Sequence, residues 1–237
     1  MARTRTLLEL RTKVRQRADI EGDPHVTDAE LTGLINDSCA ALHALLIEVD
    51  EMWFFNQMSL TTAPGVEALA VYIDSGGGAT NFYKLLHVEA TIGGIVVPLE
   101  RWTFERRTYY KNASTWGVAQ WPIAYRLSIV STKAYLYFAP VPDGAYPITV
   151  GYVRSFADLV NDADVFDGMD GWEEWVIWDA TIKCLVKEES SIVDATRERD
   201  VVLVRISSQM ATPDRDQPDV TRDVLNQTSV NRYQVRS

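Results

Sequence analysis

The pattern of hydrophobic and polar positions divides the chain into three parts. Apolar residues recur at three- and four-residue steps near both ends, in residues 7–52 and 170–210, which is the period of amphipathic helices. Between them, in residues 54–155, short apolar runs alternate with polar residues and are separated by glycine and proline, which predicts β-strands. The predicted order is therefore two helices, a sheet and two further helices.

Two helices are predicted near the N-terminus. The first spans residues 7–18, behind a capping box in which Thr6 and Glu9 satisfy each other's backbone N–H groups. A second capping box, Thr27 with Glu30, starts a longer helix of about six turns.

The most strongly patterned stretch is residues 170–189, which predicts a tryptophan-rich amphipathic helix. Asp170 and Glu173 form its predicted capping box, and Asp179 with Lys183 is spaced for an ion pair along the helix. Its tryptophans lie on the apolar stripe, so we expect Trp175→Ala or Trp178→Ala to cost several kcal/mol through cavity formation.

Within the strand-forming part, the clearest signal is a hairpin. Residues 85–92 and 95–99 are apolar runs joined by Gly93 and Gly94, a pair that favours a two-residue turn. Further alternating runs predict one antiparallel sheet of five to seven short strands, and residues 105–110 predict a short helical turn.

These elements predict an α+β protein in which N- and C-terminal helices form a helical bundle, with an inserted antiparallel β-domain and an extended C-terminal arm. The predicted domains are residues 1–53 plus 156–212 for the bundle, 54–155 for the β-domain and 213–237 for the arm. The arm is too polar to build a core. The predicted bundle core consists of apolar positions on the helix stripes: Leu31, Leu34, Ile35, Leu42, Trp175, Trp178, Ile182 and Leu185.

The charge is uneven along the chain. The formal net charge is −10, which argues against a general nucleic-acid coat. Basic residues nevertheless crowd the first helix, and a basic end on an acidic body suggests attraction to an acidic partner or to a second copy. The two cysteines, Cys39 and Cys184, fall among apolar helix residues, which predicts reduced core thiols. No apolar run approaches the length that crosses a bilayer, so no membrane association is predicted.

Catalytic and cofactor motifs are absent from the sequence, so neither an enzyme nor a cofactor or metal is predicted. The histidines, His25, His43 and His87, are not at ligand spacing for zinc. The acidic run from Asp158 to Asp170 fails the EF-hand pattern and is interpreted as a solvated linker that favours the following helix N-terminus.

Two other functions remain open at this point. Recognition of DNA by the first two helices is disfavoured, because the second helix carries acids and almost no donors that read bases. A carbohydrate-binding or glycan-cleaving protein is the main alternative. It would use carboxylate pairs and the aromatic residues of the strand-forming part, namely Trp102, Tyr109, Tyr110, Trp116 and Trp121.

Both helical ends resemble the head–tail adaptor (connector) proteins of tailed bacteriophages. The resemblance is carried by residues 166–190, FDGMDGWEEWVIWDATIKCLVKEES, which follow a strand ending VGYVR at residue 154. The N-terminal stretches LELRTKVRQRA, from residue 8, and VTDAEL, from residue 26, are similar to the start of the same family.

The resemblance implies a structural virion protein at the head–tail interface, made and assembled in the host cytoplasm. Such a subunit forms a homo-oligomeric ring beneath the portal protein, expected to be a dodecamer. The ring extends the DNA channel, without sequence-specific DNA binding, and provides the docking surface for tail or nozzle proteins. The candidate contacts with the portal or a neighbouring subunit lie in the first helix and the arm: Arg11, Arg15, Arg232, Tyr233 and Arg236.

Overall fold

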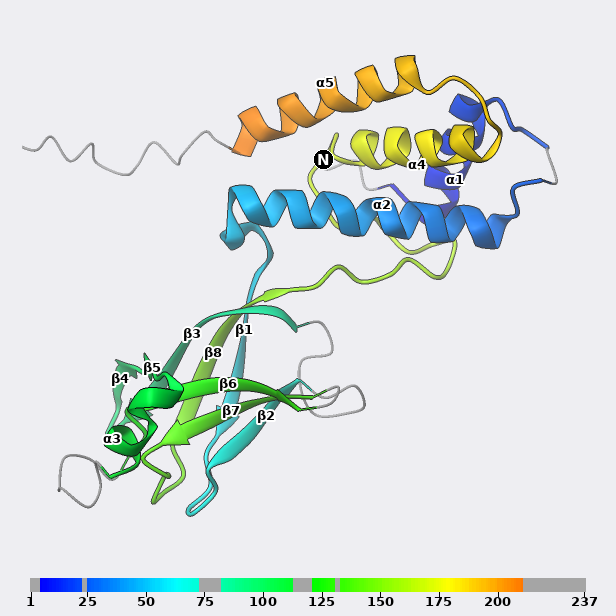
Figure 1. Cartoon of the computed structure of the whole chain (residues 1–237). Helices are drawn as coiled ribbons and strands as arrows, with labels where there is room; N and C mark the ends of the chain where they lie inside the picture. Colours follow the sequence, from blue (N-terminus) through cyan, green and yellow to red (C-terminus); the bar gives the residue numbers. More distant parts are fainter. Residues whose placement is uncertain (1–4, 23–24, 73–81, 113–120, 131–132, 211–237) are drawn as a thin grey trace, which may run out of the picture.

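The computed structural model describes residues 5–22, 25–72, 82–112, 121–130 and 133–210. Helices lie at one end of the molecule and strands at the other (Figure 1). The helical end, which we call the helical region, contains α1 (Leu7–Ala18), α2 (Asp28–Val49), α4 (Glu173–Lys187) and α5 (Val193–Met210).

The first two helices begin at the predicted caps. The Thr6 hydroxyl accepts a hydrogen bond from the Glu9 N–H at 3.3 Å, and the Glu9 carboxylate accepts one from the Thr6 N–H at 3.2 Å, so this capping box is confirmed. Thr27 likewise accepts from the Glu30 N–H at 3.3 Å. The Glu30 carboxylate instead accepts from Lys187 at 2.7 Å, so only the Thr27 half of the second capping box is formed.

The predicted capping box of the tryptophan-rich helix is wrong. Helix α4 begins at Glu173, its N-cap is Trp172, and no side chain bonds its first turn from that position. The Glu173 carboxylate is buried and accepts from the Gly171 N–H at 2.7 Å, with Arg5 Nε 3.6 Å away. Glu173 is therefore held by groups that precede the helix, and Asp170 lies outside it.

The strands form two four-stranded sheets. The first has the order β1 (Phe55–Thr61), β8 (Pro147–Arg154), β3 (Phe82–Ile92) and β4 (Ile95–Pro98). The second has the order β2 (Ala68–Tyr72), β7 (Lys133–Ala139), β6 (Ala124–Val130) and β5 (Glu100–Arg101). The predicted hairpin is confirmed as β3–β4, with Gly93 and Gly94 both at positive φ in its turn.

The two sheets enclose a core of their own. Val88 of β3 and Val150 of β8 are buried together with Leu136 and Phe138 of β7, which come from the other sheet. The short helix α3 (Arg107–Lys111), preceded by η2 (Phe104–Arg106), lies at the end of the sheets farthest from the helical region (Figure 1). We call the two sheets with α3 the β-domain.

The predicted architecture of a helical bundle with an inserted antiparallel sheet is wrong, although the α+β class stands. Helix α4 packs against α1, α2 and α5, whereas these three make few contacts with one another. The buried residues of α4 cover more than half of its circumference, so it is a central helix with others around it rather than one of four equivalent helices. The strands form a large β-domain of two sheets, and one of its pairs, β5 with β6, is parallel.

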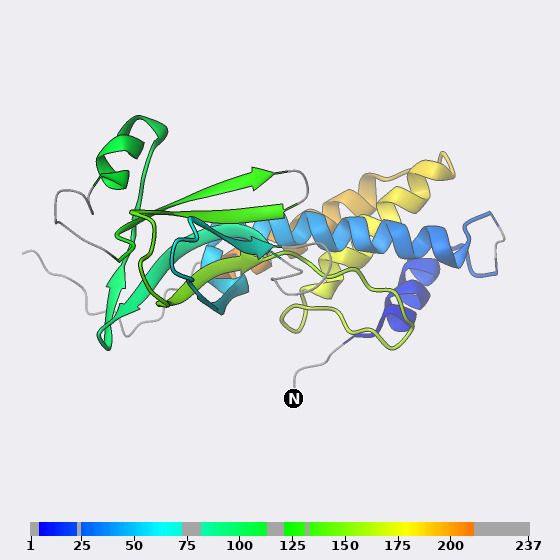
Figure 2. The same cartoon turned by 90° about the horizontal axis from the view of Figure 1, so that it is seen from below.

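Residues 155–172 return the chain from β8 to α4 beside α1 and α2 (Figure 2). The backbone of this segment bonds the start of α1, with Leu7 N–H donating to the Asp164 carbonyl at 2.8 Å. The Asn36 side chain of α2 exchanges two hydrogen bonds of 3.0 Å with the backbone of Leu159. The segment is thereby fixed along the helical region.

Candidate functional site

The predicted core residues of the helices lie in one apolar cluster, with one exception. Leu31, Ile35, Leu42 and Trp175 are buried in it. Leu34, Trp178 and Leu185 are partly buried and pack against it. Ile182 is partly exposed and lies outside the buried set. These positions are structural and present no chemical group to a partner.

A polar network crosses the helical region at Asp179, which is 8% exposed. Its carboxylate accepts from the Ser38 hydroxyl of α2 at 2.9 Å, and lies 3.0 Å from Lys183 Nζ and 3.2 Å from Arg199 Nη1 of α5. The ion pair with Lys183 was expected from spacing, whereas Ser38 and Arg199 could not be assigned from sequence. The network joins α2, α4 and α5, and a buried carboxylate with these partners is satisfied rather than available for catalysis.

The two arginines predicted for an interface already have partners within the chain. Arg11 pairs with Asp162 and Asp28, and its side chain is 12% exposed. Arg15 Nη2 lies 2.9 Å from Asp28 and donates to the Val26 carbonyl at 2.7 Å. Their role toward a portal or neighbouring subunit stays a prediction. The other candidates, Arg232, Tyr233 and Arg236, lie outside the described residues, as does the whole predicted arm.

The neighbouring Arg17 joins α1 to α4. Its guanidinium lies 4.2 Å from the ring centroid of Trp178, and its Nη2 is 2.5 Å from the Glu174 carboxylate. This combination of a cation–π contact and an ion pair covers the half-buried face of Trp178. The basic face of α1 therefore holds helices together within one chain.

The acidic residues 158–170, which precede α4, make local hydrogen bonds and ion pairs and do not form a calcium-binding loop. Asp164 accepts from the N–H groups of Val160 and Asn161 at 2.7 and 2.8 Å, and hydrogen bonds from these two backbone groups lower the pKa of its carboxyl. Asp167 pairs with Arg154 at the end of β8. Within the described ranges, no three His, Cys, Asp or Glu side chains are grouped closely enough to hold a metal ion.

His43, His87 and both cysteines have packing roles. His43 is buried against Phe54, with ring centroids 4.2 Å apart, and His87 stacks on Phe55 at 5.9 Å. Burial raises the pKa of the Cys39 thiol to about 12 and that of Cys184 to about 11. Both thiols are free and buried, and such high pKa values leave almost no thiolate to act as a nucleophile.

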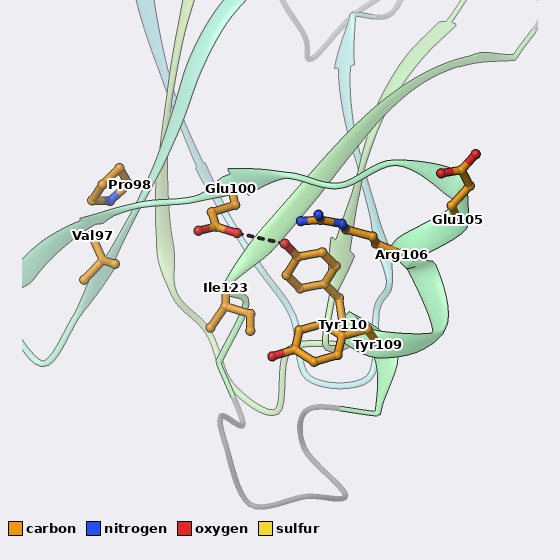
Figure 3. Close-up of a pocket in the computed structure, with 8 residues that line it drawn as sticks. All are labelled: Val97, Pro98, Glu100, Glu105, Arg106, Tyr109, Tyr110 and Ile123. Carbon is orange, nitrogen blue, oxygen red and sulfur yellow. Dashed lines mark hydrogen bonds between the residues drawn. The ribbon is translucent and has the colours of Figure 1, made fainter.

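A hollow of about 760 Å³ lies at the end of the β-domain, between β4, β5 and α3 (Figure 3). The Tyr110 hydroxyl donates to the Glu100 carboxylate at 2.8 Å, and this bond is the main reason that the pKa of Tyr110 is raised. Figure 3 shows the Glu105 carboxylate pointing away from this pair. The pocket is open and its Glu100 carboxylate is already bonded. The described residues that line it offer no facing pair of carboxylates for glycan cleavage.

The aromatic residues expected to stack on sugars are divided. Trp102 and Tyr110 are buried, whereas Tyr109 and Trp121 are exposed by 57% and 39%. Trp116 lies outside the described residues. Phe104, Ile95 and Val96 are also exposed, so the described part of the β-domain carries several exposed apolar side chains.

Comparison with known proteins gives one result that covers most of the chain. A sequence model of the family described as SU10 adaptor protein matches residues 5–189. The match spans α1, α2, the β-domain and α4, and ends before α5. A search of the curated proteins found no match. In the part of the chain that the structure describes, no helix is both long and apolar enough to cross a membrane.

Proposed function

Because the chain belongs to the SU10 adaptor protein family, we propose that it is the head–tail adaptor subunit of a tailed phage and forms a ring beneath the portal. Family membership makes it a phage adaptor protein, a structural component of the virion, and confirms the resemblance carried by its two helical ends. The match over residues 5–189 is the observation that carries the proposal.

In this proposal the ring is twelvefold, continues the DNA channel of the portal and presents a surface to tail or nozzle proteins. The net charge of −10 supports passage of DNA through the ring without binding to it, because an acidic channel wall repels the DNA phosphates. Duplex DNA would therefore pass the ring without sequence-specific contacts. Retention of duplex DNA by the purified chain in low salt would contradict this part of the proposal.

We assign a different binding partner to each of the predicted domains. Residues 1–53 with 156–212 contact the portal and neighbouring subunits, residues 54–155 meet tail components, and residues 213–237 reach along an adjacent protein. The separate apolar cores of the helical region and the β-domain support assigning different partners to the two ends. The exposed Ile95, Val96 and Phe104 at the far end of the β-domain provide an apolar surface for a tail protein.

The experiment combines the full chain with the portal protein of the same phage and analyses the mixture by native mass spectrometry and electron microscopy. We expect a ring of 26.7 kDa subunits on the portal, with twelve copies. Absence of any complex at both low and physiological salt would overturn the proposal. A ring with another copy number would correct the stoichiometry alone.

The role of the arm has its own test. A chain that ends at residue 212 should keep the thermal midpoint of the full chain and lose attachment to the portal. The matched control carries residues 213–237 in scrambled order, which preserves length and composition. Normal attachment by either variant would show that the sequence of the arm is not needed.

A further inference from the structure

Helix α5 is apolar on two opposite faces. Its inner face, with Ala195, Val202 and Ile206, is buried against the rest of the helical region. Its outer face carries Val193, Val201 and Val204, which are exposed by 71%, 58% and 71%. Single exposed valines are ordinary on protein surfaces, but three on one face of one helix form a stripe.

The outer face of α5 has no covering element among the described residues. Figure 1 shows α5 as the outermost helix, with α4 between it and α2. A shallow hollow of about 570 Å³ runs along this face, lined by Val193, Thr196, Arg197, Asp200, Val201 and Val204. These residues lie beyond residue 189, where the family match ends.

The residues of this face are self-complementary. Suppose that two α5 helices pack antiparallel about a two-fold axis that passes between residues 198 and 199. A residue on one helix then lies opposite the residue of the other helix that is equally far from the axis on its far side. Val193 then lies level with Val204 of the second copy, Arg197 with Asp200, and Thr196 with Val201. Every residue that lines the hollow therefore meets a suitable partner, which is the requirement for an isologous contact.

The charges on this face fit the same arrangement. The Arg197 guanidinium has no ion pair or hydrogen bond within the described part of the chain. Asp200 accepts from Arg199 of its own helix at 2.9 Å, which leaves carboxylate lone pairs for a second guanidinium. An antiparallel pair would place each Arg197 beside an Asp200, whereas a parallel pair in register would bring Arg197 next to Arg197.

We propose that the free chain forms a two-fold symmetric dimer through the outer face of α5, with the two helices antiparallel. A single pair of helices lies at the low end of interface sizes, so the dimer is weak and dissociates at micromolar concentrations. In this dimer both copies use the same surface, so no free copy of that surface remains to bind a third chain. A ring instead requires two different surfaces on each subunit. The dimer is therefore a state of the chain before assembly, and this inference is independent of the proposed ring.

The first test measures the mass of the full chain alone by sedimentation equilibrium, at concentrations from about 1 to 300 µM, without portal protein. We expect a monomer–dimer equilibrium that Val204→Lys weakens by about tenfold or more, because it places a charge within the apolar contact. The matched control is Val160→Lys, since Val160 is 73% exposed but lies in the segment after β8. This control should leave the equilibrium unchanged.

The second test determines the direction of the two helices by disulfide formation. Mixed chains carrying Val193→Cys and Val204→Cys should cross-link to each other. Val193→Cys alone should not, because its two copies would lie about 16 Å apart in the antiparallel pair. The native Cys39 and Cys184 are buried and should not compete.

Three results would overturn the inference. They are a monomer at every concentration, a dimer insensitive to Val204→Lys, and cross-linking of Val193→Cys to itself. An equal effect of Val160→Lys would also overturn it, because the contact would then not be specific to α5. None of these results depends on the portal. Absence of the dimer would therefore not contradict the proposed ring, and absence of the ring would not contradict the dimer.

Discussion

His87 of β3 lies against the backbone of Gly151 of β8, so that a β-carbon at position 151 would be 2.1 Å from Cε1 of the imidazole ring. The ring also stacks on Phe55 of β1 at an interplanar angle of 17°, across the neighbouring strand. The histidine thus occupies the space above β8 that a side chain at position 151 would need. Position 151 requires glycine for reasons of space, since it is not among the glycines at positive φ.

Gly151→Ala should therefore destabilise the protein by about 1–3 kcal/mol, because His87 must move and lose its stacking on Phe55. Chemical denaturation monitored by circular dichroism measures the loss. The control is Gly33→Ala in α2, where nothing lies within 4 Å of an added β-carbon. This control should raise the free energy of unfolding by about 0.5–1 kcal/mol through helix propensity. Equal stability of Gly151→Ala and the wild type would show that the ring moves without cost.

Asp179→Asn should lower the free energy of unfolding by about 1–3 kcal/mol, because Lys183 and Arg199 lose the carboxylate that they share. The measurement is the denaturation midpoint at neutral pH. Asp37→Asn on the exposed face of α2 is the control, and we expect a change below about 0.5 kcal/mol. A large effect in the control, or none at Asp179, would contradict the importance of the network.

Stability should fall on the acidic side of pH 6.5 in a way that depends on His43. Burial lowers the pKa of His43 below its usual 6.5, and the hydrogen bond with the Arg154 backbone opposes this only in part. Below pH 6.5 the unfolded chain binds a proton that the folded chain binds only at lower pH, so the free energy of unfolding decreases as the pH falls. The loss is complete once the pH is below the folded pKa.

Thermal midpoints of the wild type and His43→Asn, measured from pH 8 to pH 5, provide the test. The variant should be less stable at pH 8, and the difference should shrink as the pH falls. A difference that stays constant over this range would show that His43 has the same pKa in the folded and unfolded chains.

Trp175→Ala should destabilise the protein more than Trp178→Ala, whereas the sequence alone predicts a cost of several kcal/mol for either substitution. Trp175 is 4% exposed in the apolar core, so its removal leaves a cavity and costs about 3–5 kcal/mol. Trp178 is only partly buried and loses mainly its packing and its contact with Arg17. Urea denaturation of the two variants decides the order, and the reverse order would place the buried stripe of α4 on its other side.

Local signals predicted the elements well, because they rest on neighbouring residues. The box of Thr6 and Glu9 gives the start of α1, and the pair Gly93–Gly94 gives the β3–β4 turn. The short helical turn around residues 105–110 is also confirmed as η2 and α3. Each of these depends on hydrogen bonds or φ angles within a few residues.

Long-range pairing could not be predicted in the same way. Alternation shows that residues 54–155 contain strands, but it does not show which strands share a sheet, and the prediction of one sheet was wrong. The partners of Arg11 and Arg15 include Asp28 and Asp162, whose proximity depends on the complete fold. Helix α5 is a different case. The spacing of Val193, Val201 and Val204 is visible in the sequence and could have indicated its second apolar face.

Helices α1 and α2 pack on α4, which is synthesised only after every strand of the β-domain. Arg17 and Glu174, which pair across this contact, are 157 positions apart in the chain. At about 5–20 residues per second, the ribosome needs on the order of ten seconds or more to bridge such an interval. Throughout that interval the apolar faces of α1 and α2 lack their final partner, while the strands are being synthesised. The nascent N-terminal helices are thus the segment of this chain for which protection by a chaperone during translation matters most.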